Sequence, residues 1–149
     1  MKVSILQYNY IPWKGYFDII AKSDVFVIYD EVQYTKNDWR NRNKILTPNG
    51  TNWLTIPVRV DSLNQKICET KVASNNWNKK HFNSIQFNYS KAKGYKEFKD
   101  ILSDLYESTP ELLTEINVRF IKTICNYLGI KTKIIDSRDL KFHTDSYII

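Results

Sequence analysis

Polar and aromatic side chains cluster directly after two short apolar runs in the first third of the chain. The first cluster, residues 7–17, reads QYNYIPWKGYF and follows the apolar run at 3–6. The second cluster comprises residues 30–36 and 39–43 and follows the apolar run at 25–29. If both runs are strands of a parallel sheet, their carboxyl ends meet at one edge, where open α/β sheets bind ligands. We therefore expect both clusters to contribute to one functional hollow.

The first cluster is suited to binding an anion. A Pro-Trp-Lys-Gly turn at 12–15 leads from the first apolar run into a predicted helix at 16–22. Free backbone N–H groups and the positive end of the helix dipole meet at such a junction, and both favour negative charge. The ligand-binding residues predicted in this cluster are Gln7, Tyr10, Trp13 and Gly15.

The elements that must position these clusters form a predicted βαβ unit. A short β-branched and aliphatic run at 2–7 and a continuous apolar run at 25–29 predict buried strands, and Phe17, Ile20 and Ala21 stand at helical spacing between them. Two strands joined by one helix over so short a stretch predict a parallel pair with a right-handed crossover. The fold class is therefore α/β, starting from a parallel sheet.

The rest of the chain predicts a β-hairpin insertion, a run of three helices and a last strand. Pro-Asn-Gly at 48–50 is a strong turn signal between 39–46 and 52–60. Trp53, Thr55 and Pro57 alternate with Leu54, Ile56 and Val58, as in a strand with one buried face. Thr109, followed by proline, predicts the start of the longest helix, which ends before Gly129. The remaining predicted elements are a possible strand at 66–72, helices at 79–89, 95–106 and 109–128, and a strand at 131–135.

Composition and charge limit the classes of function. The 149 residues fit one domain, and 22 Lys and Arg against 16 Asp and Glu give a net charge of +6, which suits phosphate-bearing ligands. The sequence has no block of five or six like charges, so a tail dedicated to nucleic-acid binding is not predicted. Cys68 and Cys125 are isolated, so no metal site is predicted, and no motif identifies a cofactor. The sequence has neither a signal peptide nor a membrane-length apolar run, which predicts a cytoplasmic protein.

Several linked motifs resemble the WbqC-like protein family. They are the first cluster, Ser-Asp-Val-Phe-Val at 23–27, the Asp-x-Val-Gln-Tyr-x-Lys and Trp-Arg-Asn-Arg-Asn motifs of the second cluster, and Trp-Leu-Thr-x-Pro-Val at 53–58. His81 with Tyr89, and Leu-Gly-Ile at 128–130, resemble later blocks, so the match covers almost the whole chain. Tyr8 stands where the family usually has proline. Family members normally continue into a further C-terminal part, so we expect a single domain, 1–149, truncated relative to the family.

The resemblance implies a role in the biosynthesis of bacterial surface polysaccharide, such as the O-antigen of lipopolysaccharide. Members of the family are suggested to transfer an acyl or aminoacyl group, with glycine among the proposals, to an amino sugar. The implied ligand is a phosphate-bearing small molecule such as a nucleotide sugar or an acyl donor. The chain would then be a transferase if it is active.

Acyl transfer needs a base, an acceptor site and groups that stabilise an oxyanion. Asp30 and Glu31 could hold a sugar hydroxyl or accept a proton, and with Lys36 they are the predicted catalytic residues. Cationic side chains could bind a pyrophosphate, aromatic ones could stack on a sugar or base, and amides could orient hydroxyls or polarise a carbonyl. The substrate-binding residues predicted in the second cluster are Gln33, Tyr34, Trp39, Arg40, Asn41, Arg42 and Asn43.

Structural roles stand as alternatives beside these assignments. Trp13 could staple the helix onto the sheet, and Asp30 could cap a turn. Arg40 and Arg42 alternate along a predicted strand and could form a solvated face. His81, at a predicted helix start, is expected to cap or pack rather than to catalyse.

Three other functions also remain open. A strand followed by Pro-Trp-x-Gly-Tyr at a helix start resembles the His-x-Gly-His nucleotidyltransferases, although Trp13 and Tyr16 replace both histidines. That likeness suggests a nucleotidyltransferase-like or adenylate-forming enzyme. A non-catalytic nucleotide-sugar binding module is the second alternative. Binding of single-stranded RNA is the third and least expected, suggested by aromatic and basic residues that interleave between Tyr34 and Arg42.

Overall fold

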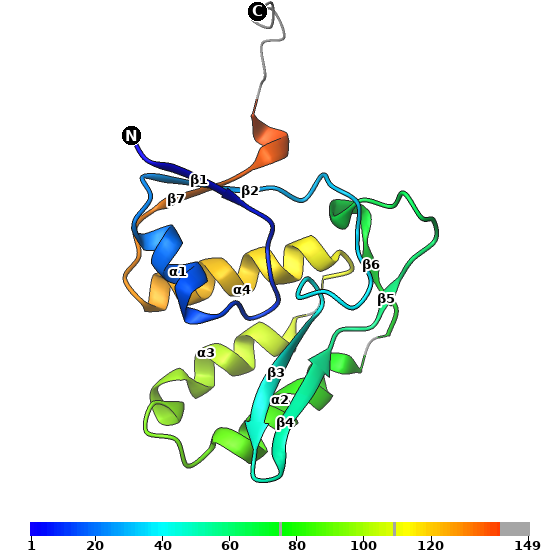
Figure 1. The fold of residues 1–149 in the computed structure, drawn as a ribbon. Helices are drawn as coiled ribbons and strands as arrows, with labels where there is room; N and C mark the ends of the chain where they lie inside the picture. The colour runs from blue at the N-terminus through cyan, green and yellow to red at the C-terminus, as the bar shows by residue number, and fades with distance from the viewer. Residues whose placement is uncertain (75, 109, 141–149) are drawn as a thin grey trace, which may run out of the picture.

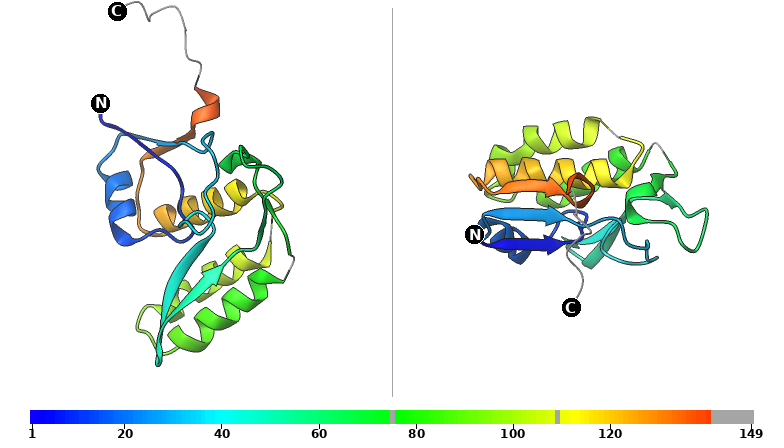
Figure 2. Two further views of the ribbon diagram at one scale, coloured as in Figure 1. Left: turned by 45° about the vertical axis from the view of Figure 1, so that its right-hand side comes forward. Right: turned by 90° about the horizontal axis from the view of Figure 1, so that it is seen from above.

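The computed structural model describes residues 1–74, 76–108 and 110–140. Strand β1 (Val3–Leu6), helix α1 (Lys14–Ala21) and strand β2 (Val25–Ile28) form the predicted unit, in which β1 and β2 are parallel. Strand β7 (Lys133–Asp136) pairs in parallel with the other edge of β2, which gives the order β1-β2-β7. Figure 2 shows the three strands side by side from above, and Figure 1 shows α1 and α4 beneath the sheet. The α/β class and its parallel sheet are confirmed.

The hairpin is also confirmed, as a separate two-stranded sheet of β3 (Arg42–Thr47) and β4 (Gly50–Thr55). Its turn contains Gly50 at φ 110, a left-handed backbone conformation that glycine adopts without strain. The first strand was predicted to begin at residue 39 but begins at Arg42, because residues 39–41 bond to other parts of the chain. The second breaks at Pro57, which lacks an N–H group, and resumes as β5 (Val58–Arg59).

The prediction of a strand at 66–72 is wrong except at the end of that range, where β6 (Lys71–Val72) pairs with β5. Residues Ile67–Glu69 form a 3-10 turn instead. The carboxylate of Glu69 accepts a hydrogen bond from the Lys66 amide at 3.0 Å, and the Thr70 amide donates to the Ile67 carbonyl at 3.1 Å. These local bonds favour a turn over an extended segment.

Three further helices complete the fold: α2 (Trp77–Tyr89), α3 (Tyr95–Glu107) and α4 (Leu113–Tyr127). Helix α4 begins four residues later than residue 109, because the chain before it pairs with β6. The Val72 amide donates to the Glu111 carbonyl at 2.9 Å, and the Leu113 amide donates to the Thr70 carbonyl at 2.9 Å. Gly129 follows the helix at φ 72, as predicted. The predicted cap Thr109 and the chain end at 147–149 lie outside the described residues.

Candidate functional site

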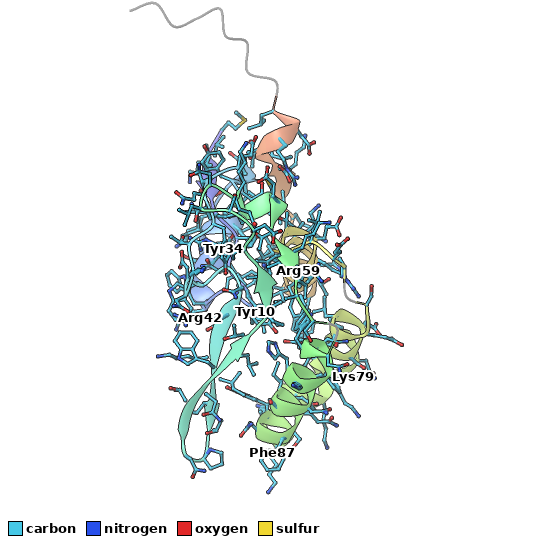
Figure 3. The ribbon with its side chains drawn as sticks, turned by 90° about the vertical axis from the view of Figure 1, so that its right-hand side faces the viewer. Tyr10, Tyr34, Arg42, Arg59, Lys79 and Phe87 are labelled. Atoms are coloured by element: carbon cyan, nitrogen blue, oxygen red, sulfur yellow. The ribbon has the colours of Figure 1, made fainter. Side chains whose placement is uncertain are left out.

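The two predicted clusters lie against each other, because the second holds the backbone of the first. The Tyr10 amide donates to the Trp39 carbonyl at 2.9 Å. The Arg40 guanidinium donates to the Gln7 side-chain oxygen at 2.7 Å and to the Tyr8 carbonyl at 3.2 Å. These bonds join the loop after β1 to the loop before β3. Figure 3 shows Arg42 at the start of the hairpin strand β3.

Asn43 supports an unusual conformation in the first loop. Ile11 has φ 44, a left-handed conformation that costs a side chain roughly 1–2 kcal/mol. The Asn43 side-chain amide donates to the carbonyls of Tyr10 at 3.0 Å and of Ile11 at 2.5 Å. The strained residue directly precedes Pro12 and Trp13, so this bond pair fixes the direction in which the tryptophan leaves the loop. Strain of this kind is typical of functional sites.

Two adjoining hollows open where the loops meet. The first, of about 350 Å³, is here called the tryptophan hollow, and its lining is Asn9, Pro12, Trp13, Trp39 and Asn43. The second, of about 480 Å³, includes Gln7 and Arg40 in its lining and is called the arginine hollow. Asn9 and Trp13 line both, so a ligand can contact the two at once. Trp13 is 64% exposed and Trp39 is 45% exposed, which leaves both rings available for stacking.

Trp53 extends this aromatic surface onto the hairpin. Its ring centroid lies 5.5 Å from that of Trp39. The Arg42 guanidinium lies 4.2 Å from the Trp53 centroid and the Lys44 ammonium 4.7 Å from it, both within cation–π range. Asn9, Pro12, Lys44 and Trp53 belong to the site but were not predicted from the sequence. The alternation in the sequence placed Trp53 on the face opposite Leu54 and Ile56; those two are buried, and Trp53 is 44% exposed.

Gly15 has a role in packing the tryptophan. A Cβ atom added to Gly15 would lie 1.8 Å from the nearest carbon of the Trp13 indole. The indole therefore rests against the first turn of α1 and occupies space that a side chain would need. This arrangement covers the part of the helix start at which we expected an anion.

Several predicted binding residues are buried and bond to the protein itself. Tyr10 is fully buried, and its hydroxyl bonds to His81 Nδ1 at 2.9 Å and to the Tyr106 hydroxyl. Asn41 is buried and donates to the Ile56 carbonyl at 2.9 Å. Tyr34 is buried, Gln33 donates from its side chain to the Leu63 carbonyl, and neither lines the two hollows. His81 packs in the core, as expected.

The three predicted catalytic residues do not line these hollows. Asp30 is 0% exposed and accepts a hydrogen bond from the Thr114 hydroxyl at 2.9 Å, with the Arg138 guanidinium 3.6 Å away. Burial raises the pKa of Asp30, while the bond from Thr114 and the charge of Arg138 oppose that rise. Glu31 accepts from the Ser137 hydroxyl at 3.0 Å and lines another hollow, of about 580 Å³. Lys36 is exposed and lies outside both hollows.

The described residues offer little for metal or thiol chemistry. Among them, no group of three or more His, Cys, Asp or Glu is placed to hold a metal ion. Burial raises the pKa of the Cys125 thiol to about 11 and also raises that of Cys68, so both thiols are poor nucleophiles. None of the helices in residues 1–74, 76–108 and 110–140 has the length and apolarity needed to cross a membrane.

The fold and site thus define a small α/β protein with a tryptophan-walled hollow beside its parallel sheet. The sequence matches the WbqC-like protein family over residues 7–147, and the chain belongs to that family, which is linked to polysaccharide biosynthesis. It is 49% identical over 140 residues to the uncharacterized protein Rv1507c of Mycobacterium tuberculosis. The alignment covers 93% of this chain and 61% of that relative, so the chain spans less than two thirds of its length. No solved structure matches significantly.

Proposed function

We propose that the tryptophan and arginine hollows bind a nucleotide-linked amino sugar, as the acceptor of an acyl or aminoacyl group in polysaccharide biosynthesis. The observation that carries this proposal is the shared wall of the two hollows. Trp13 and Asn9 contact both, so a ligand can stack a sugar face on indole while its hydroxyls meet amide groups. Sugar ligands need both kinds of contact, since their rings have apolar faces and polar edges.

The cations beside Trp53 suit the phosphate-bearing part of such a ligand. Arg42 and Lys44 stack on the ring that neighbours Trp39, so a nucleotide extending from the tryptophan hollow meets aromatic and cationic groups together. Arg40 contributes mainly by holding the loops, because it already bonds to Gln7 and the Tyr8 carbonyl and lies 3.5 Å from Asp38. Arg42 also donates to the side-chain oxygen and the backbone carbonyl of Asn37, but both bonds are exposed and neither holds the first loop, so Arg42 is the better candidate for a phosphate contact.

In the proposed reaction the amine nitrogen of the sugar attacks the carbonyl carbon of an activated acyl donor. The new N–C bond forms, the bond from that carbon to the leaving group breaks, and an amine proton passes to the leaving group. The side-chain amide of Asn9 lines both hollows and can donate a hydrogen bond to a ligand oxygen. The hollows thus supply binding and orientation, which alone lower the barrier of a bimolecular step.

Isothermal titration with UDP-glucosamine, UDP-glucose, UDP and ATP tests the proposal. The expected result is binding of the amino sugar nucleotide, weakened at least tenfold by Trp39→Ala. Phe87→Ala is the matched control, because Phe87 is an exposed aromatic residue on α2, outside both hollows (Figure 3). The proposal would be contradicted if neither nucleotide sugar bound to the protein, or if Trp39→Ala and Phe87→Ala changed the affinity equally.

The same titrations separate the alternatives. Binding of ATP alone, with exchange of pyrophosphate into it, would favour nucleotidyl transfer, which the indole covering the start of α1 does not favour. Steeply salt-dependent binding of a single-stranded RNA would favour RNA recognition instead. If UDP-glucosamine binds but no donor supports acyl transfer, the protein is better explained as a non-catalytic nucleotide-sugar binding module.

A further inference from the structure

An apolar pocket of about 550 Å³ lies between the hairpin and the helices α2 and α3. Its walls include Ile45 and Leu54 from the hairpin, Ile85 from α2, and Phe98 and Leu102 from α3. The volume falls within the range of about 300–1,000 Å³ that is usual for small-molecule sites, which are also predominantly apolar. The nucleotide-sugar proposal makes no use of this pocket.

The apolar pocket adjoins the tryptophan hollow. Trp13 and Asn43 line both, and the strained Ile11 lines the apolar pocket. The bond from Asn43 to the Ile11 carbonyl therefore supports the boundary between an apolar space and a polar one. A ligand that crosses this boundary would have an apolar part and a polar end.

Two tyrosines, Tyr89 and Tyr95, are among the residues that line the pocket. The Tyr95 hydroxyl oxygen is buried and has no hydrogen-bond partner among the described residues. The Tyr89 hydroxyl accepts from the Leu46 amide at 2.8 Å, which leaves its own proton free to donate. The polar groups of the lining are thus few beside its aliphatic and aromatic side chains, as in other sites for largely apolar ligands.

We propose that this pocket holds the apolar acyl chain of the acyl donor, an acyl thioester, with its carbonyl directed toward Trp13 and Asn43. This inference rests on the proposed function and specifies its donor. The amine of the sugar in the tryptophan hollow attacks the thioester carbon, the N–C bond forms, the C–S bond breaks, and the thiol leaves with an amine proton. A glycyl group has no chain to fill such a pocket, so the donor is an alkanoyl rather than a glycyl thioester.

Isothermal titration with octanoyl-N-acetylcysteamine and glycyl-N-acetylcysteamine tests this choice. The unmodified protein should bind the octanoyl thioester at least tenfold more tightly than the glycyl one. Ala92→Trp places an indole at the lining of the pocket and should weaken octanoyl binding at least tenfold. Ser90→Trp is the matched control, because Ser90 is exposed nearby and does not line the pocket.

A second filling variant guards against misfolding of the first. Gly94 also lines the pocket, and a Cβ atom there meets no heavy atom within 4 Å, so Gly94→Leu should fold normally. Equal binding of the two thioesters, or unchanged octanoyl binding in both filling variants, would overturn the inference. UDP-glucosamine binding should survive Ala92→Trp. Nucleotide-sugar binding without octanoyl binding rejects only this inference, whereas octanoyl binding without nucleotide-sugar binding rejects the proposed function.

Discussion

His81 should make the stability of this protein fall between pH 7 and pH 5. Its Nε2 atom lies 3.2 Å from the Thr55 carbonyl oxygen, so Nε2 carries the proton and Nδ1 accepts from the Tyr10 hydroxyl at 2.9 Å. Burial lowers the pKa of His81 from 6.5 to about 4, although the bond to Thr55 opposes that shift. The neutral imidazole thus belongs to the folded state, and it ties the first loop to α2.

The size of the effect follows from the two pKa values. Between pH 6.5 and 4 the unfolded chain binds a proton at His81 that the folded chain does not, so acidification favours unfolding. The contribution of His81 is fully present above the unfolded pKa and is lost as the pH falls toward the folded value. From pH 8 to pH 5, a shift of this size lowers the free energy of unfolding by about 2 kcal/mol.

Urea unfolding at pH 8, 7, 6 and 5 measures this loss in the unmodified protein and in His81→Gln. The variant lacks the titrating ring, while titrations elsewhere are common to both proteins and cancel in the difference. The unmodified protein should lose about 2 kcal/mol more than the variant over this range. Parallel pH profiles of the two proteins would show that the pKa of His81 is the same in the folded and the unfolded chain, and would refute the reasoning.

Further substitutions, at Arg40, Arg42 and Asn43, test the connection between the loops. Arg40→Ala should lower the free energy of unfolding by about 3 kcal/mol, because hydrogen bonds from a charged donor each contribute roughly 1.5–3 kcal/mol. Arg42→Ala should cost less than Arg40→Ala, about 1 kcal/mol, because half-buried Arg42 contributes a cation–π pair with Trp53 and exposed bonds to Asn37, while the change weakens ligand binding. Equal stability losses in urea would contradict this division. Asn43→Ala should cost about 2 kcal/mol, and less in an Ile11→Gly background, since glycine adopts φ 44 without strain. A double-mutant cycle that shows no coupling would argue against the role of Asn43.

Local patterns in the sequence predicted most of the fold. The apolar runs predicted the parallel strands β1 and β2, and the Pro-Asn-Gly turn predicted the hairpin at its observed position. Helical stripes predicted α2 and α3 closely. Each of these signals depends on neighbouring residues only, which is why a single sequence suffices to detect them.

Contacts between distant residues explain what the sequence did not reveal. The late start of α4 depends on pairing of residues 111–113 with β6, some forty residues earlier, which leaves no local signal. Asp30 looks the same in sequence whether it is buried or exposed, and its partner Thr114 is 84 residues away. The meeting of Trp13 and Trp39 could be predicted, because both follow strands that end at one edge of the sheet. Their common hollow is observed, whereas their ligand stays a prediction.

The most direct test of the account is the response of the tryptophan indole N–H signals to UDP-glucosamine in a ¹H–¹⁵N correlation spectrum. The chain has four tryptophans, so the indole region is simple to assign by substitution. Trp13 and Trp39 should shift on titration, while Trp77, which is 4% exposed in the core, should serve as a fixed reference. Unchanged signals from both hollow-lining indoles at saturating ligand would contradict the claim that this hollow is the binding site.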